Sequence, residues 1–364
     1  MRAVVYDRYG PPESLRVDDV PTPSPTTNQV LLRVLATSVN LSDWESLRGA
    51  PLYARLGGLR APARRTLGSD VAGRVEAVGS GVTRFRVGDE VYGDNLQLKG
   101  GFAEYAVAPE SALAHKPEEL TFAEASAIPQ AAAIALRGTA GVAAGQRVLI
   151  NGAGGGSGSF AIQLAKRAGA HVTGVDNAGK LDFMRSLGAD HVIDYGSDDF
   201  TRSDEPYDLV LDLVAHRSPF ACRRALAPHG RYWCVGGPVR TLLAIMTIGS
   251  IIGRLTRRRM GVLVVPLGPR YFTPLTDLGV AGDIGIHIDR TFGLDEVPEA
   301  LRYVGEGLAH GKVVVTTTEC RPVSQRRPSA PSHAQCAGVA GWMFLLLWNT
   351  FSGSCLAFTS ASRR

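Results

Sequence analysis

Cysteine is scarce in this chain, with five residues in a total of 364. Only Cys222 and Cys234 precede residue 320, and no CxxC pair or cluster of cysteine and histidine occurs. This scarcity excludes a disulfide framework and a structural zinc lobe. The first residues, Met1–Tyr6, have the pattern of a strand and not that of a signal peptide. We therefore expect a reducing compartment, with the cytoplasm as the predicted location.

The body of the chain lacks an excess of charge of either sign. The sequence pI is about 9.0 and the formal net charge is +5. Residues 320–364 contain five arginines and no acidic residue, which equals the whole net charge, so residues 1–319 are balanced. A basic body that would suit DNA or RNA is therefore not expected, and no nucleic-acid partner is predicted.

The tail carries a stretch of 22 uncharged residues, Ala337–Phe358, which is long enough to span a bilayer. Only Val339–Trp348 is strongly apolar, and Ser, Thr, Asn and Gly dilute the rest. The favoured interpretation is that this stretch belongs to an extension without a role in chemistry. Weak membrane association through 337–358 is the alternative. Arg321–Ala334 is rich in Pro, Ser and Arg and is predicted to be disordered.

Glycine is concentrated in one turn that is typical of an anion site. An apolar run ends at Asn151, and Gly152, Gly155 and Gly158 follow before helical periodicity begins. Backbone N–H groups at a helix N-terminus, together with the helix dipole, favour bound negative charge. A second strand ending in Asp176 lies at the distance expected for dinucleotide binding. Gly155, Gly156, Ser157 and Gly158 are predicted to bind a pyrophosphate.

The order of elements predicts an α/β fold of two domains. Residues 1–120 have short β-type runs between Pro- and Gly-rich turns, and Phe122–Gly138 is Ala-rich and helical. Alternating strands and helices then predict a doubly wound parallel sheet. They are expected at 147–151, 158–169, 171–176, 180–187, 190–194, 207–213, 218–226 and 230–235. Residues 239–260 are predicted to form a surface helix pair near the cleft.

The residues alone allow two interpretations of the site that would bind the adenosine end of the dinucleotide. The Asp176 carboxylate could hold the ribose hydroxyls and select NAD. Lys180 and Tyr195 close by would instead suit the 2′-phosphate of NADPH. Residue types alone do not choose between the two cofactors.

Short motifs along residues 1–318 carry a family resemblance. They are Asn40-x-x-Asp43-Trp44, Gly68-Ser69-Asp70-x-x-Gly73, Val78-Gly79-x-Gly81-Val82, Gly101-Phe102-Ala103-Glu104-Tyr105, Leu187-Gly188-Ala189-Asp190, Gly236-Gly237 and Gly311-Lys312-Val313-Val314. In this order and spacing, around the glycine turn, they resemble the medium-chain dehydrogenase/reductase superfamily, in its zinc-free quinone-oxidoreductase-like branch.

The resemblance implies how the chain is divided. A GroES-like substrate domain would comprise residues 1–121 and 266–318, and a Rossmann NAD(P)-binding domain would comprise residues 122–265. Residues 319–364 would be a disordered or accessory tail. A homodimer formed through the edge of the Rossmann sheet is expected by the same resemblance.

The resemblance also implies roles at the cofactor. In related members a Lys and a Tyr at the positions of Lys180 and Tyr195 meet the 2′-phosphate, which favours NADPH, while Asp176 keeps NADH open. The Gly236-Gly237 strand end would pass near the nicotinamide. Ile134 stands where many relatives have a polar residue beside that ring.

The resemblance disfavours a catalytic metal, because the zinc-ligand positions hold Asn40, Ser69 and Asp70 and no cysteine precedes Cys222. Hydride delivery to a quinone or an α,β-unsaturated carbonyl is then the expected reaction. The Asn40 amide could donate to the carbonyl oxygen of such a small-molecule substrate, and Tyr53 and Tyr92 are candidate phenols of the cleft. The alternatives are an NAD(P)-dependent alcohol dehydrogenase of the same superfamily and an NADPH-binding scaffold of low turnover.

Overall fold

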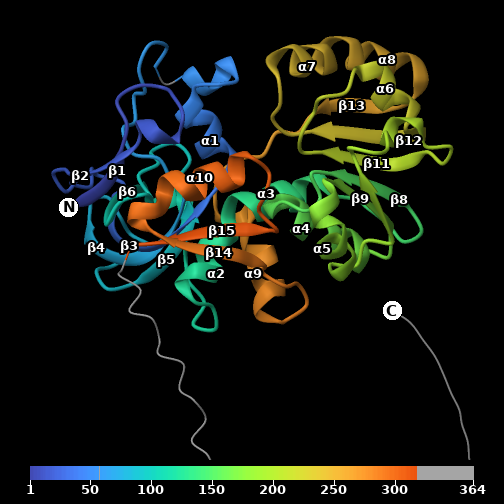
Figure 1. The fold of residues 1–364 in the computed structure, drawn as a ribbon. Helices are drawn as coiled ribbons and strands as arrows, with labels where there is room; N and C mark the ends of the chain where they lie inside the picture. The colour runs from blue at the N-terminus through green and yellow to red at the C-terminus, as the bar shows by residue number, and fades with distance from the viewer. Residues whose placement is uncertain (57, 318–364) are drawn as a thin grey trace, which may run out of the picture. The chain divides into compact units, whose positions relative to one another are not determined.

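A computed structural model describes residues 1–56 and 58–317 (Figure 1). The tail predicted at 319–364, with its uncharged stretch at 337–358, lies outside the described residues. The described chain forms one mixed sheet, one parallel sheet and a small two-stranded sheet of β1 (Arg2–Val5) and β2 (Arg16–Asp19). The predicted α/β fold is confirmed, with a β-rich part and a doubly wound parallel part.

The mixed sheet has seven strands and joins the start of the chain to its described end. Its order is β14-β15-β3-β4-β5-β7, and β6 pairs with β3. The strands are β3 (Gln29–Val39), β4 (Asp70–Val78), β5 (Glu90–Asp94), β6 (Tyr105–Pro109), β7 (Leu113–His115), β14 (Ile288–Gly293) and β15 (Lys312–Thr316). In the antiparallel pairing of β15 with β3, Val313 lies opposite Val39, so Lys312 arrives beside Asn40.

The second sheet has six parallel strands in the order β10-β9-β8-β11-β12-β13. They are β8 (Arg147–Asn151), β9 (His171–Asp176), β10 (His191–Asp194), β11 (Tyr207–Asp212), β12 (Leu226–Cys234) and β13 (Arg259–Val262). The chain leaves β8 toward β9 and later crosses back to β11 on the other side. Ligands of such sheets bind beyond the carboxyl ends at this switch point.

The helices predicted at 158–169, 180–187 and 218–226 are present, and the stretch predicted at 122–138 forms two helices. Most flank the two sheets, and α2 and α3 lie in the Ala-rich stretch that precedes the parallel sheet. They are α1 (Leu41–Arg48), α2 (Phe122–Ala127), α3 (Pro129–Gly138), α4 (Gly156–Arg167), α5 (Leu181–Ser186), α6 (Pro219–Arg224), α9 (Thr273–Val280) and α10 (Val297–Gly305). The limits of the two domains drawn from the sequence stay a prediction.

The helix pair predicted at 239–260 is wrong. The chain forms one uninterrupted helical stretch, α7 (Val239–Ala244), a π-helical turn (Ile245–Gly249) and α8 (Ser250–Thr256). Arg257 then adopts a left-handed conformation and ends it, and β13 follows at once. Among the described residues, Val239–Thr256 is the single helix that is long and apolar enough, by length and composition alone, to cross a membrane.

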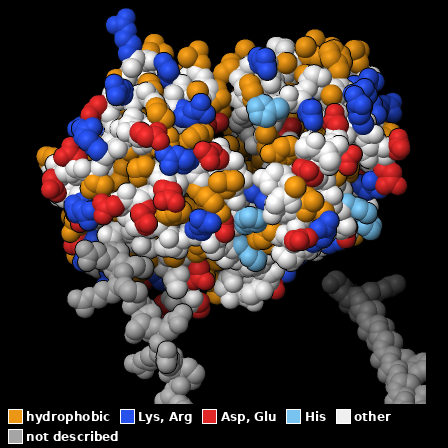
Figure 2. Space-filling view, in the orientation of Figure 1, with side chains coloured by type: hydrophobic (Ala, Val, Ile, Leu, Met, Phe, Trp, Pro, Cys, Tyr) orange, Lys and Arg blue, Asp and Glu red, His pale blue; other side chains and the backbone are white. Residues whose placement is uncertain are grey.

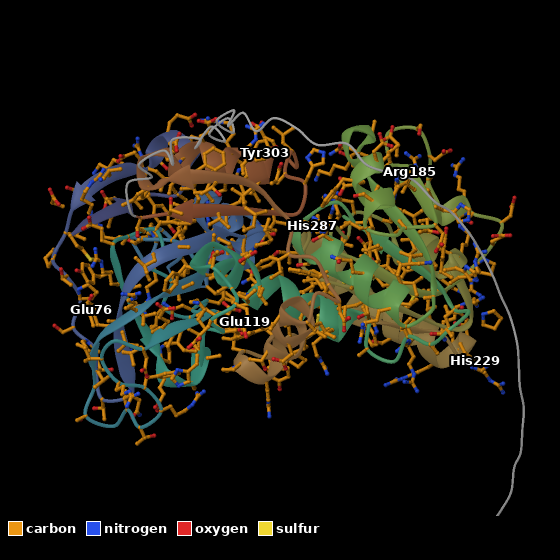
Figure 3. All side chains as sticks on the ribbon, turned by 90° about the horizontal axis from the view of Figure 1, so that it is seen from below. Glu76, Glu119, Arg185, His229, His287 and Tyr303 are labelled. Atoms are coloured by element: carbon orange, nitrogen blue, oxygen red, sulfur yellow. The ribbon has the colours of Figure 1, made fainter. Side chains whose placement is uncertain are left out.

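The segment before β14 connects the two sheets through side-chain contacts. The rings of His287 and Phe183 meet edge to face with centroids 5.6 Å apart. Figure 3 labels His287. The Gln163 side chain on α4 donates to the Gly285 carbonyl and accepts from the Gly285 N–H. His287 therefore packs where the segment before β14 meets α5.

Candidate active site

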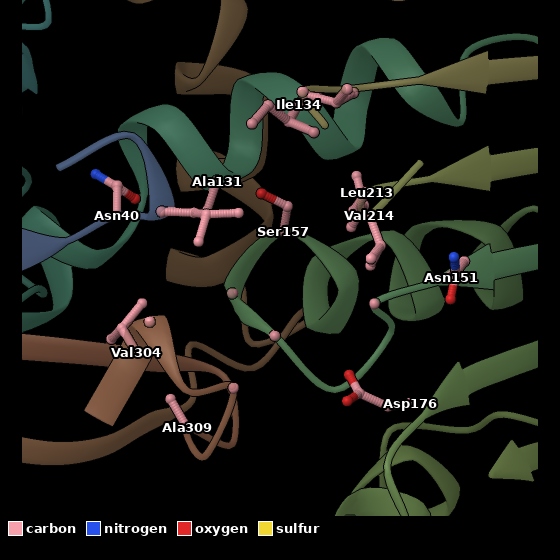
Figure 4. Close-up of a pocket in the computed structure, with 18 of the residues that line it drawn as sticks. Asn40, Ala131, Ile134, Asn151, Ser157, Asp176, Leu213, Val214, Val304 and Ala309 are labelled. Carbon is pink, nitrogen blue, oxygen red and sulfur yellow. The ribbon is translucent and has the colours of Figure 1, made fainter. Parts of the chain in front are cut away.

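A cavity of about 710 Å³ opens at the carboxyl ends of the parallel strands (Figure 4). One side is formed by the glycine turn and the start of α4, the opposite side by Val304–Lys312, and the far end by the start of α1. Of the residues predicted for the site, nine line it: Asn40, Gly152, Gly155, Gly156, Ser157, Asp176, Lys180, Tyr195 and Gly236.

The glycine turn brings backbone close to backbone. Gly152 has a φ of +83°, which few other residues adopt without strain. At Gly158 an added Cβ would lie 2.3 Å from the Gly152 carbonyl oxygen, so only glycine allows α4 to start this close to β8. Gly155 precedes the first turn of α4 as its N-cap, and no side chain caps that turn. The free N–H groups of this turn lie at the cavity wall and can bind an anion.

The Asp176 carboxylate is bound to the glycine turn. Its Oδ2 accepts the Gly154 N–H at 2.9 Å, and its Oδ1 accepts the Asn177 N–H at 2.9 Å. The Lys180 ammonium lies 3.5 Å from the same carboxylate and is 4% exposed. Tyr195 is more than half exposed at the cavity rim. The carboxylate thus holds the turn and pairs with the lysine, and Lys180 and Tyr195 both line the cavity.

The segment Val304–Lys312 closes the cavity opposite the turn. The Gly311 N–H donates to the Gly154 carbonyl at 2.9 Å, and the Asn177 side chain donates to the Gly307 carbonyl at 3.1 Å. Sequence reasoning did not assign these residues to the site. The contacts join positions more than 100 residues apart, so no local pattern could have revealed them.

At the far end of the cavity, the Asn40 amide is fully hydrogen bonded. Its Nδ2 donates to Asp70 Oδ2 at 2.9 Å and to Ser69 Oγ at 3.0 Å, and its Oδ1 accepts from Lys312 Nζ at 2.6 Å. Its backbone N–H donates to Asp43 Oδ2 at 3.1 Å, which explains the Asn40-x-x-Asp43 motif as a helix cap. An amide with both N–H groups engaged has no donor left for a substrate.

Lys312 and Asp70 form a buried pair beneath the cavity. The Lys312 ammonium lies 3.6 Å from Asp70 Oδ2, and neither side chain is more than 3% exposed. Burial lowers the pKa of Lys312, an effect that the Asp70 charge opposes. Burial raises the pKa of Asp70, while Lys312 and the Asn40 side chain act the other way. Lys312 also lines the cavity, and its side chain passes over Gly156 at the start of α4.

The two tyrosines predicted as cleft phenols have different surroundings. Tyr53 Oη donates to Glu45 Oε1 at 3.0 Å, and Glu45 lines the cavity, so Tyr53 reaches the site through a carboxylate. Burial raises the pKa of Glu45 and that of Tyr53. Tyr92 is 1% exposed, shares a hydrogen bond of 2.7 Å with Thr276 Oγ1 and does not line the cavity. The structure therefore does not place Tyr92 in the cleft, because the ring packs in the core against Phe272.

The middle of the cavity is apolar. The side chains that form it come from α3, from the segments that directly follow β11 and β12, and from α10 and the turn after it: Ala131, Ile134, Leu213, Val214, Val235, Val304 and Ala309. Figure 4 labels all of these except Val235. Gly236 lines this region, whereas Gly237 lies behind it, where an added Cβ would meet Ala215 Cβ at 2.8 Å.

The positions at which the resemblance places zinc ligands hold a hydrogen-bonded polar network. Asn40 and Ser69 bond to each other, and neither an amide nor a hydroxyl belongs to the usual donor set of zinc. In the described part of the chain, no three His, Cys, Asp or Glu residues are grouped as metal ligands would be. Sequence reasoning placed Gly311-Lys312 among the family motifs but gave the lysine no role.

Comparisons with known proteins agree with this architecture. The family model "Alcohol dehydrogenase GroES-like domain" matches residues 26–118, and "Zinc-binding dehydrogenase" matches residues 187–315. A chloroplastic quinone oxidoreductase of Triphysaria versicolor is 34% identical over 333 residues, covering 86% of this chain and 98% of that protein. A mitochondrial NAD(P)H oxidoreductase of Bos taurus is 32% identical, covering 86% of this chain and 89% of that protein.

A solved structure gives the same result for the fold. The quinone oxidoreductase of Coxiella burnetii matches with a TM-score of 0.79 and 31% identity, covering 87% of this chain and 99% of that one. The two relatives above are named chloroplastic and mitochondrial, so the cytoplasmic location stays a prediction. The glycine turn, the paired sheets and these similarities together show an oxidoreductase that belongs to the medium-chain dehydrogenase/reductase superfamily, in its quinone-oxidoreductase-like branch.

Proposed function

We propose that this protein is an NADPH-dependent, zinc-independent reductase of quinones and α,β-unsaturated carbonyls. The observation that carries the proposal is the single cavity that connects the anion site at the start of α4 to the polar cluster around Lys312. An apolar middle section lies between these two ends, as a cofactor with a charged end and a flat reactive ring requires.

The residues present fit NADPH. The free N–H groups of Gly156, Ser157 and Gly158 would hold the pyrophosphate. The Asp176 carboxylate accepts the Gly154 N–H of the turn, so we do not assign it to the ribose. Lys180, which is paired with Asp176, and Tyr195 would bind the 2′-phosphate. When bound, NADPH supplies the hydride, and NADH stays the alternative cofactor.

On the substrate side, we assign the hydrogen bond to the carbonyl oxygen to Lys312. Reduction of a quinone or enone develops negative charge on the carbonyl oxygen, and a preorganised cation beside that oxygen would stabilise it until a proton is taken up from water. An ammonium has three donors; the Lys312 ammonium donates one to Asn40 Oδ1 and forms an ion pair with Asp70 Oδ2 at 3.6 Å. We assign a remaining donor to the substrate, so that Asn40 positions Lys312 and is not itself the donor.

The zinc-independence of the reaction rests on donor chemistry. A catalytic zinc in this fold needs three protein ligands of the Cys, His or carboxylate type. The cluster instead pairs the Asp70 carboxylate with the Lys312 ammonium, which supplies the positive charge at that place. A homodimer through the edge of the parallel sheet is part of the same proposal, by resemblance to the family.

The test is NADPH oxidation by the purified full chain with a panel of benzoquinones, naphthoquinones and small enones, before and after extraction with EDTA. We expect turnover that EDTA leaves unchanged. Turnover that requires added zinc would overturn the metal-free mechanism. Tight NADPH binding without turnover on any substrate of the panel would instead favour a cofactor-binding scaffold.

A further inference from the structure

Glu45 is a carboxylate at the far end of the cavity, the substrate end of the function proposed above, and it takes no part in the proposed hydride transfer. It lies on α1 and lines the cavity together with Leu41 and Ser42 of the same helix. An added Cβ at Gly236 would lie 3.9 Å from Glu45 Oε1 and 3.7 Å from Tyr53 Oη. The carboxylate and the phenol therefore reach the edge of the apolar middle section, where a substrate ring would lie.

The charge of Glu45 is not matched by a cation at close range. Tyr53 Oη donates to Glu45 Oε1 at 3.0 Å, and among the described residues no Lys, Arg or His forms an ion pair with Glu45. Burial raises the pKa of Glu45, and the Tyr53 hydrogen bond and the charge of Lys99 oppose this rise. The Lys99 ammonium itself lies 3.8 Å from Asp43 Oδ1. The negative charge of Glu45 is thus offset by a neutral hydroxyl and by a more distant ammonium.

The positive charge of Lys312, which lines the same end of the cavity, already has a partner. Its ammonium lies 3.6 Å from Asp70 Oδ2 and donates to Asn40 Oδ1, and both partners are buried. An ammonium paired in this way still donates a hydrogen bond to a neutral carbonyl oxygen, but it attracts an anionic substituent less than a free one does. Lys99 and Lys312 thus each have a carboxylate of their own, and Glu45 is the carboxylate that remains.

The opposite end of the cavity suits negative charge. The free N–H groups at the start of α4 lie at the wall there, and Lys180, His216 and Arg217 line the same end. Such groups suit the phosphates of a dinucleotide. On the face shown in Figure 2, acidic and basic side chains are intermixed over the β-rich part, so the difference in charge is a property of the cavity.

We propose that Glu45 makes the substrate site selective for uncharged quinones and enones and excludes those that carry an anionic substituent. The inference rests on the function proposed above, because it concerns the substrate of that reaction. An anionic group that entered beside Glu45 would lose its water shell and face a like charge where apolar surroundings screen charges poorly. A repulsive element of this kind sets specificity without adding a contact to the accepted substrate.

The test compares trans-β-acetylacrylate, an enone with a carboxylate, with its uncharged methyl ester. We expect Glu45→Gln to raise the ratio of kcat/KM for the acid to kcat/KM for the ester roughly 10- to 100-fold, the scale of one partly screened like-charge contact. The intrinsic reactivities of the two enones cancel, because the same pair is measured with both proteins. The glutamine keeps an oxygen that can accept the Tyr53 hydroxyl.

The matched control is Glu306→Gln. Glu306 is an exposed glutamate between two glycines that line the cavity, but it does not line the cavity itself. Its removal should leave the ratio of acid to ester as it is in the unaltered chain. Circular dichroism and NADPH affinity verify that each variant is folded.

A second measurement does not need turnover. It is a calorimetric titration of the chain saturated with NADP⁺ with the two saturated products, levulinate and methyl levulinate. Glu45→Gln should strengthen the binding of levulinate relative to methyl levulinate by a factor similar to that seen in kcat/KM.

Equal ratios of acid to ester in the unaltered chain and in Glu45→Gln would overturn the inference and leave the proposed reductase intact. A preference of the unaltered chain for the acid would do the same, because it would show that Lys312 sets the charge of the site. Absence of turnover with the ester and with every quinone and enone of the panel would overturn the proposed function, and the inference with it.

Discussion

The two ends of the cavity are built in different ways. At the cofactor end, the glycine turn and Asp176 come from one continuous β–α–β unit, and backbone N–H groups do the binding. At the substrate end, Asn40, Asp70 and Lys312 come from three strands or strand ends of the mixed sheet, and buried side chains carry the charge. Backbone sites depend on a short local sequence, whereas a buried polar cluster depends on every partner at once.

Substitution of Lys312 should have the largest effect at the substrate end of the cavity. We expect Lys312→Met/Asp70→Asn to lower kcat by roughly 10²- to 10³-fold, which is the usual effect of losing a donor to a developing oxyanion. NADPH affinity should stay within a few-fold, because the anion site is untouched. The double change avoids leaving the Asp70 carboxylate buried without a cation. An unchanged kcat in this folded variant would remove Lys312 from the chemistry.

The pH dependence of kcat tests the same residue from another side. Burial lowers the pKa of Lys312 below the ordinary value of a lysine, so its charge is lost at a lower pH than that of an exposed lysine. If the ammonium is the working form, kcat falls as the pH rises through that pKa. In Lys312→Arg the alkaline fall should disappear, because guanidinium stays protonated. A fall that persists in this variant would assign the titration to another group.

The cofactor end can be tested by adding one methyl group at two neighbouring glycines. In Gly158→Ala the new Cβ would meet the Gly152 carbonyl oxygen, so we expect a loss of about 1–3 kcal/mol in the free energy of unfolding and weaker NADPH binding. In Gly155→Ala the nearest atom is 3.5 Å away, so stability should be kept and NADPH affinity alone should fall. Thermal melts and NADPH titrations measure both. Equal melting temperatures for the two variants would mean that the backbone of the glycine turn can shift to accommodate the added Cβ at position 158.

Substitutions that change the preference for NADPH over NADH should have smaller effects at the cofactor end. Lys180→Ala should weaken NADPH roughly 10- to 100-fold, the usual value of a hydrogen bond to a charged group, and leave NADH nearly unchanged. Asp176→Ala should weaken both cofactors, because the carboxylate holds the Gly154 N–H in the turn. Fluorescence titration measures the affinity of each variant for NADPH and NADH. A loss confined to NADH in Asp176→Ala would show that the carboxylate binds the ribose.

The smallest effect is expected at Tyr92. Tyr92→Phe removes one buried hydrogen bond to Thr276 and should cost about 1 kcal/mol of stability. Its kcat should equal that of the unaltered chain, because the ring does not reach the cavity. Denaturant unfolding and steady-state kinetics are the measurements. A large fall in kcat would return Tyr92 to the list of site residues.

Much of the fold could be predicted because its signals are local. The strands at 147–151 and 171–176 agree residue for residue with the structure, since apolar runs and turn glycines are contiguous patterns. The predicted helix pair at 239–260 is wrong because the chain continues as one helical stretch from Val239 to Thr256, and the left-handed Arg257 that ends it has no sequence signal.

The sequence by itself determined the anion site, since a strand, a glycine turn and a helix follow one another along the chain and form together. Only the tertiary structure decided what faces that site. Pairing of β15 with β3 brings the Lys312 ammonium to Asn40 Oδ1 across 272 positions of sequence. Asp70 and Ser69 occupy the Asn40 Nδ2 donor that the sequence had offered to the substrate. Hydrogen-bonding capacity is finite, so the role of a polar side chain is set by the partners that folding supplies.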